Sequence, residues 1–235
     1  MTRNIKDILA EYTPSKCLFK IQKKIRDKRL LKLRAPYLKE IERLIDKDTS
    51  IISSNCFAGR IMQDLGMHYI SPTLGLYFWS PDYIEFLSHL HYYLTEAKIT
   101  FVEHSKYPLG DKRRKEWKYW YPIGQLDGKV EIHFLHYHTE EEAASKWYRR
   151  ASRVNWNKLM IIGMEQNLCT VEDIKAFDQL PYDNKIFFST KELPEVKSNW
   201  YVPDFKADGQ VGDPYSKTDI FYRELVKYLK EKELK

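Results

Sequence analysis

The sequence has few cysteines, no long apolar run and none of the common nucleotide-binding motifs. Its three cysteines, Cys17, Cys56 and Cys169, form an odd, sparse set without metal-ligand spacing, which argues against a disulfide framework and for a reducing compartment. No stretch approaches the roughly 18 apolar residues of a membrane span, and the first residues lack the apolar core of a signal peptide. We therefore expect a cytoplasmic protein.

The absence of several well-known catalytic and nucleotide-binding motifs reduces the number of reactions to be considered. The chain has no Gly-x-Gly-x-x-Gly, no P-loop, no Gly-x-Ser-x-Gly and no His-Glu-x-x-His. Nucleotide-dependent hydride or phosphoryl transfer is therefore disfavoured. The acids of residues 204–213 do not have the spacing of a calcium loop, and we expect neither a metal site nor a tightly bound cofactor.

What is present is the composition of a globular domain with one basic segment. Hydrophobic residues make up 43% of the chain and charged residues 31%, and the formal net charge is +6. Within residues 16–34, nine Lys or Arg residues stand against the single acid Asp27, and apolar side chains are interleaved with them. This pattern predicts peripheral contact with the inner membrane or with a phosphate-rich ligand, the alternative being a solvated helix face. Nucleic acid ranks last, because no nucleic-acid motif accompanies the segment.

The alternation of apolar runs predicts an α/β fold. Residues 1–48 are expected to form a basic helical arm, with a new helix beginning at Pro36, and residues 49–235 a single α/β domain. Strands separated by helices indicate a mostly parallel central sheet flanked by helices, a Rossmann-like three-layer arrangement. The strands are expected at 50–55, 99–103, 130–137, 159–163 and 186–189, with an exposed excursion at 104–120 and a loop at 191–217.

Cys56 is the first candidate for chemistry, because it lies where the first strand is expected to turn into a helix. The helix dipole and free N–H groups at such a turn favour a thiolate and bind an oxyanion or a phosphate. Gly59 permits a close approach of the ligand to the backbone. The alternative is a buried cysteine that acts as a small hydrophobe.

Histidines form the second set of candidates. On a strand, His136 and His138 project to one face, whereas His133 points the other way and is expected to be packed or exposed. Ligands of parallel sheets bind at the carboxyl ends of the strands, where His136 is placed to act as a general base. His68 follows Cys56 closely enough in the sequence to be a second candidate base. No third ligand accompanies the histidines for a metal.

Arg149 and Arg150 lie on the helix expected after the histidine-bearing strand. Arginines in this position are suited to bind phosphate or carboxylate groups. A solvated helix face is the alternative.

Three segments carry a family resemblance. Residues 54–60 (Ser-Asn-Cys-Phe-Ala-Gly-Arg), 64–73 (Asp-Leu-Gly-Met-His-Tyr-Ile-Ser-Pro-Thr) and 79–87 (Trp-Ser-Pro-Asp-Tyr-Ile-Glu-Phe-Leu) resemble an uncharacterised bacterial family labelled exopolysaccharide biosynthesis protein. The resemblance covers about residues 36–190 and implies a role in exopolysaccharide or capsule gene clusters. Asn55-Cys56 alone is similar to capsule acetyltransferase-like proteins that bind coenzyme A. The family often has two glycines after the cysteine, where this chain has Ala58-Gly59, which narrows the space for a ligand.

The resemblance and the residues together predict an O-acetyltransferase that acts on a sugar or polysaccharide precursor, with coenzyme A as the carrier of the donor group. Cys56 would be the nucleophile or part of the oxyanion site, and His136 or His68 the base. The remaining candidates are expected to bind coenzyme A (Asn55, Gly59, Arg149 and Arg150) or the sugar (Ser54, His138 and Trp79). The alternatives are a glycosyltransferase that uses a nucleotide sugar and a non-catalytic carbohydrate- or partner-binding module of a capsule assembly complex.

Overall fold

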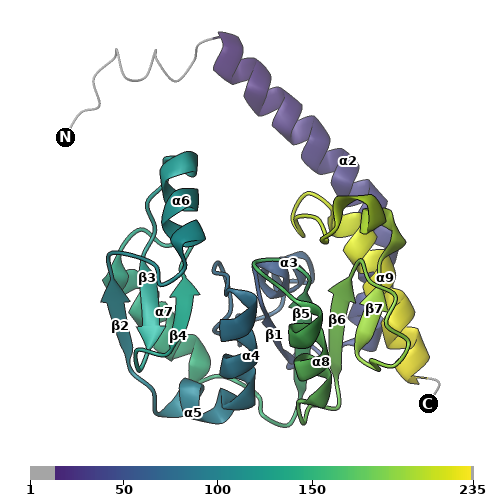
Figure 1. Ribbon diagram of the computed structural model, residues 1–235. Coiled ribbons are helices and arrows are strands. Elements are labelled where there is room, and N and C mark those ends of the chain that lie inside the picture. The colour runs from purple at the N-terminus through teal and green to yellow at the C-terminus, as the bar shows by residue number, and fades with distance from the viewer. Residues whose placement is uncertain (1–13, 234–235) are drawn as a thin grey trace.

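The structure is a computed structural model that describes residues 14–233, without the side chains of residues 14–20, 22–24 and 26–27. Its centre is a parallel four-stranded sheet of order β1-β5-β6-β7, formed by Ser50–Ser53, Leu159–Met164, Lys185–Ser189 and Asn199–Tyr201. A second, antiparallel sheet of order β2-β3-β4 is formed by Ile99–Val102, Ile123–Leu126 and Val130–His133. Figure 1 shows the two sheets on opposite sides of the molecule, with α4 between them. The mixed α/β class expected from the sequence is confirmed.

The helices cover both faces of the parallel sheet. In chain order the helical elements are α2 (Pro14–Leu44), α3 (Phe57–Asp64), α4 (Ser80–Ser88), α5 (Leu90–Thr95), α6 (Pro108–Trp117), α7 (Glu140–Ala151), α8 (Val171–Gln179), the 3-10 helix η1 (Pro203–Asp208) and α9 (Thr218–Glu233). Alternate strand residues enter two cores, Ile52 with α4 and α8, and Ile51 with α3 and α9. This is the three-layer arrangement.

The strands expected at 99–103 and 130–137 are not in the parallel sheet, and this part of the prediction was wrong. β3 and β4 form a hairpin whose turn is Asp127-Gly128, with φ of 47° and 69°. Aspartate followed by glycine is the usual sequence of a type I′ turn, whose two positive φ angles join antiparallel strands. β4 also ends at His133, so His136 and His138 do not lie on a strand.

Three further segments differ from expectation. Pro36 does not begin a helix but lies inside the continuous α2. The expected excursion at 104–120 contains α6, and the expected loop at 191–217 contains the edge strand β7. Thr139 and Thr170 cap α7 and α8, since each side chain accepts the N–H of the third helical residue.

The helical arm is anchored at its C-terminal half and projects from the body at its N-terminal half (Figure 1). Ile41 packs in the core shared with α9, and buried Arg34 lies 3.3 Å from a carboxylate oxygen of Asp64. Asp64 also accepts the hydroxyl of Tyr222 from α9 at 3.0 Å. Among residues 14–233, no helix is long and apolar enough to cross a membrane.

Candidate functional site

A cavity of about 910 Å³ lies at the carboxyl ends of β1 and β5. Its walls come from the turns after these strands, the segment after β4, α6, α7 and the loop before α9. The lining combines polar, aromatic and cationic side chains with a few aliphatic ones and one acid: Asn55, Cys56, Gly59, Gln63, Tyr69, Leu74, Gly75, Tyr77, Arg113, Trp117, Leu135, His136, Tyr137, Lys146, Arg150, Gln166, Asn167 and the segment 210–215. This is the edge at which parallel sheets bind their ligands.

The turn between β1 and α3 is held by its own side chains. Asn55 Oδ1 accepts the N–H of Phe57 at 3.0 Å, and Ser53 Oγ accepts the N–H of Ala58 at 3.0 Å. Two of the N–H groups at the start of α3 are therefore already bonded. The sequence analysis expected free N–H groups at the start of α3 that could bind an oxyanion. For the N–H groups of Phe57 and Ala58 this expectation is wrong.

Cys56 lines the cavity as a neutral thiol. Its side chain is buried, and Sγ lies 3.5 Å from the carbonyl oxygen of Leu76, to which it donates. Burial raises the pKa of Cys56 to about 12, and the nearby carboxylate of Asp213 adds to the shift. The thiolate expected from the helix dipole is thus not favoured, because the loss of hydration outweighs the dipole.

A chain of amide hydrogen bonds joins the cavity floor to the loop before α9. Asn55 Nδ2 donates to Gln166 Oε1 at 2.9 Å. Gln166 Nε2 donates in turn to the carbonyl oxygens of Val211 at 3.1 Å and Gly212 at 2.9 Å. Asn55 therefore fixes the walls of the cavity, and both of its amide atoms are engaged in doing so.

One wall is a stack of aromatic rings and cations. Arg150 lies over the ring of Tyr69 at 5.6 Å and donates to the hydroxyl of Tyr137. Tyr137 donates to the carbonyl oxygen of Leu74 at 2.6 Å, and Lys146 lies over its ring at 5.5 Å. These contacts hold two cationic groups at the surface of the cavity.

Arg113 supplies a third cation that the sequence analysis did not single out. It lies over the ring of Trp79 at 4.5 Å and that of Tyr77 at 5.7 Å, and donates to Asn167 Oδ1 at 2.7 Å. The segment expected as an excursion contains four consecutive basic residues, 112–115, and only the helical geometry of α6 shows which of them faces the cavity.

His136 lines the same cavity. The residue as a whole is exposed, but partial desolvation of the imidazole at the cavity wall lowers its pKa, so the ring is neutral at pH 7. Its backbone N–H donates to the carbonyl oxygen of Gly75 at 2.9 Å, next to the backbone that contacts Cys56. Gly75 has φ of 72°, and a Cβ there would lie 3.3 Å from His136 and Tyr137.

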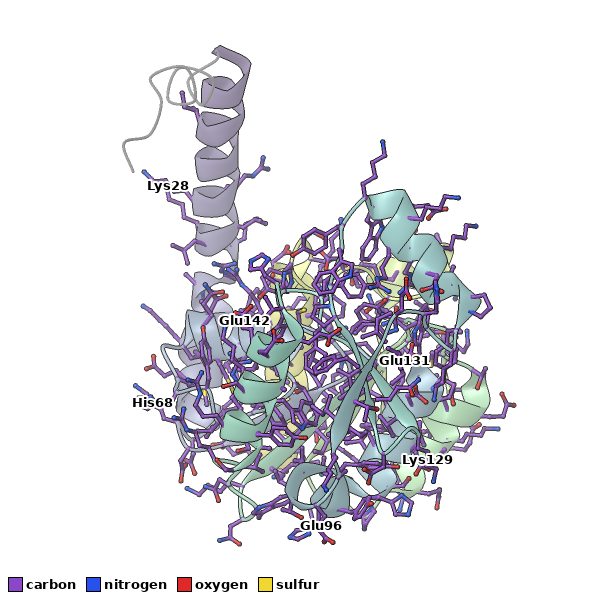
Figure 2. The ribbon with its side chains drawn as sticks, turned by 90° about the vertical axis from the view of Figure 1, so that its left-hand side faces the viewer. Lys28, His68, Glu96, Lys129, Glu131 and Glu142 are labelled. Carbon is purple, nitrogen blue, oxygen red and sulfur yellow. The ribbon has the colours of Figure 1, made fainter. Side chains whose placement is uncertain are left out.

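The structure does not bring all the expected residues to the cavity. Gly59 and Arg150 line it, whereas Arg149 and His138 are exposed and do not. Two more lie elsewhere: Ser54 is buried, and His68 is exposed at the periphery of the molecule (Figure 2).

Trp79 is fully buried and does not line the cavity, although its ring contacts two residues that do, Arg113 and Tyr77. Asp213 is the one carboxylate among the lining residues. It accepts the backbone N–H of Tyr215 and of Ser216, which ties it to the start of α9. Within residues 14–233, no cluster of three or more His, Cys, Asp or Glu side chains could hold a metal ion.

Comparison with known proteins places the chain in a family. A protein of Haemophilus influenzae, named "uncharacterized protein", is 37% identical to it over 171 residues, which cover 73% of this chain and 76% of the relative. The sequence model of one protein family matches residues 28–233 of this chain, a range that includes every residue that lines the cavity. The chain belongs to the family described as domain of unknown function DUF1919.

Proposed function

We propose that the protein is an acyltransferase that moves an acyl group, in the simplest case acetyl, from a coenzyme A thioester to a hydroxyl group of a sugar or polysaccharide precursor. The observation that carries the proposal is the composition of the cavity. Three cationic side chains, Arg113, Lys146 and Arg150, are interleaved with aromatic rings around a neutral histidine. Coenzyme A presents phosphate groups for the cations and an adenine ring for the aromatic side chains.

The scarcity of carboxylates in the described lining of the cavity favours a coenzyme A thioester over a metal-bound nucleotide sugar as the donor. Metal-dependent glycosyl transfer requires carboxylates that are free to hold a divalent cation. Asp213 is the one carboxylate of the lining, and both of its oxygens accept backbone N–H groups. The cations of the cavity can neutralise phosphate groups without a metal.

The state of Cys56 supports direct transfer rather than an acyl-enzyme. The acceptor hydroxyl attacks the thioester carbonyl, the carbon–sulfur bond breaks, and coenzyme A leaves as a thiol. A base accepts the hydroxyl proton, and the leaving sulfur takes a proton in exchange. His136 is the base predicted from the sequence, and its lowered pKa keeps it neutral at pH 7. A sugar as acceptor is supported by the resemblance of residues 54–60 and 79–87 to exopolysaccharide biosynthesis proteins.

The experiment measures thiol release from acetyl-coenzyme A in the presence of a panel of sugar nucleotides and oligosaccharides. We expect release that depends on the acceptor, with a raised KM for acetyl-coenzyme A in Lys146→Gln. Lys112→Gln is the matched control, because Lys112 is exposed on α6 and does not line the cavity. Consumption of a nucleotide sugar without thiol release would replace acyl transfer by glycosyl transfer. Binding of oligosaccharides without any turnover would favour a carbohydrate-binding module.

The basic arm supports a second, separate proposal of peripheral membrane contact. Ile21, Ile25, Leu31 and Leu33 of α2 are about half exposed, and the N-terminal half of this helix projects from the body (Figure 1). They do not form one stripe, because Leu31 and Leu33 face different sides of the helix from Ile21. The contact is therefore expected to be mainly electrostatic, with binding to anionic vesicles that is lost at high salt. Equal sedimentation with neutral and anionic vesicles would contradict it.

A further inference from the structure

A second polar cluster lies within the antiparallel sheet, against the wall of the cavity. Glu131 and His133 are two residues apart on β4 and both have 0% of their surface exposed. Figure 2 shows Glu131 inside the body of the protein. A carboxylate and an imidazole are costly to remove from water unless their polar atoms are hydrogen-bonded. The partners of these two side chains therefore decide what the cluster can do.

Glu131 is surrounded by donors. Its Oε2 accepts the backbone N–H of Lys106 at 2.8 Å, and its Oε1 accepts the hydroxyl of Ser105. The same Oε1 lies 2.8 Å from His133 Nε2. Burial raises the pKa of Glu131, but the hydrogen bonds from His133, Ser105 and Lys106 outweigh it, and the net pKa is below 4.5. An ionised Glu131 places the imidazole proton on Nε2, so that Nδ1 carries a lone pair.

The lone pair of Nδ1 faces two tyrosine hydroxyls. Tyr77 Oη lies 3.0 Å and Tyr121 Oη 3.3 Å from His133 Nδ1, and the two hydroxyls are 3.0 Å apart. The ring of Tyr77 is stacked on the imidazole with an interplanar angle of 19°, so its hydroxyl approaches Nδ1 from outside the imidazole plane. The ring of Tyr121 is not stacked on the imidazole but inclined to it at 59°, and we take its hydroxyl as the partner of the Nδ1 lone pair. Hydrogen bonds thus run from Glu131 through His133 and Tyr121 to Tyr77.

The outer end of this chain reaches the cavity. Tyr77 lines it, and Arg113, which also lines it, lies over the tyrosine ring at 5.7 Å. Burial raises the pKa of the Tyr77 phenol, and the nearby Arg113 offsets only part of this, so Tyr77 stays neutral and the cation favours negative charge on a ligand oxygen.

At the inner end of the hydrogen-bond chain, His133 Nε2 lies close to both Glu131 and Trp79, and the two contacts require different protonation of Nε2. Trp79 Nε1 lies 2.8 Å from His133 Nε2, and an indole N–H can donate there only when Nε2 carries no proton. The contacts of Nε2 with Glu131 and with Trp79 therefore belong to opposite tautomers. When the Nε2 proton moves to Glu131 and Nδ1 receives one from Tyr121, the Trp79 contact becomes a hydrogen bond.

We propose that Glu131, His133, Tyr121 and Tyr77 form a buried proton relay that accepts a proton from a hydroxyl group bound beside Arg113 in the cavity. Tyr77 takes the ligand proton and passes its own to Tyr121, Tyr121 passes its proton to His133 Nδ1, and the Nε2 proton moves to Glu131. The ligand oxygen becomes negative and Glu131 neutral, so charge is conserved. Each hydroxyl of the relay then donates toward the ligand oxygen.

The role of the relay in acyl transfer rests on the proposed function, whereas the relay itself does not. In that reaction Tyr77 is the catalytic residue that receives the acceptor proton. Tyr121, His133 and Glu131 act through it as positioning residues. The relay thereby replaces His136, the base predicted from the sequence, as the acceptor of this proton, and His136 is left to contact the ligand.

The test of the relay uses nitrogen NMR of the histidine-labelled full-length protein at pH 7, without ligand. We expect His133 to be protonated at Nε2, and the Nδ1 resonance to shift in Tyr77→Phe and Tyr121→Phe, both of which keep the ring. Tyr93→Phe is the control, because that hydroxyl bonds to Glu85, outside the cluster. A proton on Nδ1 in the free protein, or a His133 resonance that changes no more than in the control, overturns the relay.

A second readout separates the relay from the proposed reaction. Thiol release from acetyl-coenzyme A is expected to fall on the order of 100-fold in kcat in Tyr77→Phe, with little change in KM. Wild-type turnover by Tyr77→Phe overturns the catalytic assignment. If no coenzyme A thioester is turned over by the wild type, the acyltransferase proposal fails, and the NMR result alone decides the relay.

Discussion

The thiol of Cys56 gives the sharpest prediction, which concerns its reaction with iodoacetamide at pH 8. An unshifted thiol with a pKa of 9.0 is about 10% ionised at this pH, whereas a pKa of about 12 leaves about 0.01% as thiolate. Because the thiolate is the reacting species, alkylation of Cys56 in the folded protein is expected to be slower by about a thousandfold. Its 7% exposure slows the reaction further.

The assay is a time course of alkylation followed by peptide mass spectrometry, on the folded protein and on protein in guanidinium chloride. The Cys56 peptide is expected to stay unmodified in the folded protein and to react promptly when unfolded. Alkylation of Cys56 at the same rate in both states would refute the reasoning, since it would show an accessible thiolate. That result would also restore the covalent mechanism.

Further predictions concern the walls of the cavity and the buried carboxylate of Glu131 in the antiparallel sheet. Asn55→Ala removes the cap on Phe57 and the tie to Gln166, and should cost about 1–2 kcal/mol in urea unfolding, where an unchanged midpoint would contradict it. Gly75→Ala is strained at φ of 72° and is expected to lower the melting temperature; an unchanged value would refute the steric argument. Since the folded pKa of Glu131 is below its unfolded value of 4.5, its ionisation stabilises the protein above pH 4.5, and this is lost as the pH falls through the folded pKa. Wild type and Glu131→Gln should therefore differ more in stability at pH 7 than at pH 4, and a constant difference would contradict this.

The periodicity of the sequence predicted β1, β5 and β6 of the parallel sheet, but it missed the edge strand β7 and wrongly added residues 99–103 and 130–137. The apolar runs ending at Ser53 and Gly163 correctly placed β1 and β5, and with them the turn that carries Cys56. The Asp127-Gly128 turn was present in the sequence and would have assigned β3 and β4 to a hairpin. The alternation of a strand was extended to His136 and His138, although β4 ends at His133.

The electrostatic state of the site could not be predicted from the sequence. The helix dipole predicted a reactive Cys56, but the burial that raises its pKa depends on contacts made by segments distant in the chain. His133 is packed, one of the two outcomes expected for it, but because β4 is buried on both faces, alternation along the strand does not show which partners it has. Its partners Tyr77 and Tyr121 come from other segments, and only the folded chain brings them together.

The central claim, that the cavity binds coenzyme A, is tested most directly by thermal unfolding of the protein with coenzyme A, acetyl-coenzyme A and nucleoside diphosphates. A ligand at 100 times its dissociation constant stabilises the folded state by about 2.7 kcal/mol, which is readily measured. The account predicts stabilisation by coenzyme A and its acetyl thioester that is reduced in Lys146→Gln and retained in Lys112→Gln. Stabilisation by nucleoside diphosphates alone, or by none of these ligands, would contradict it.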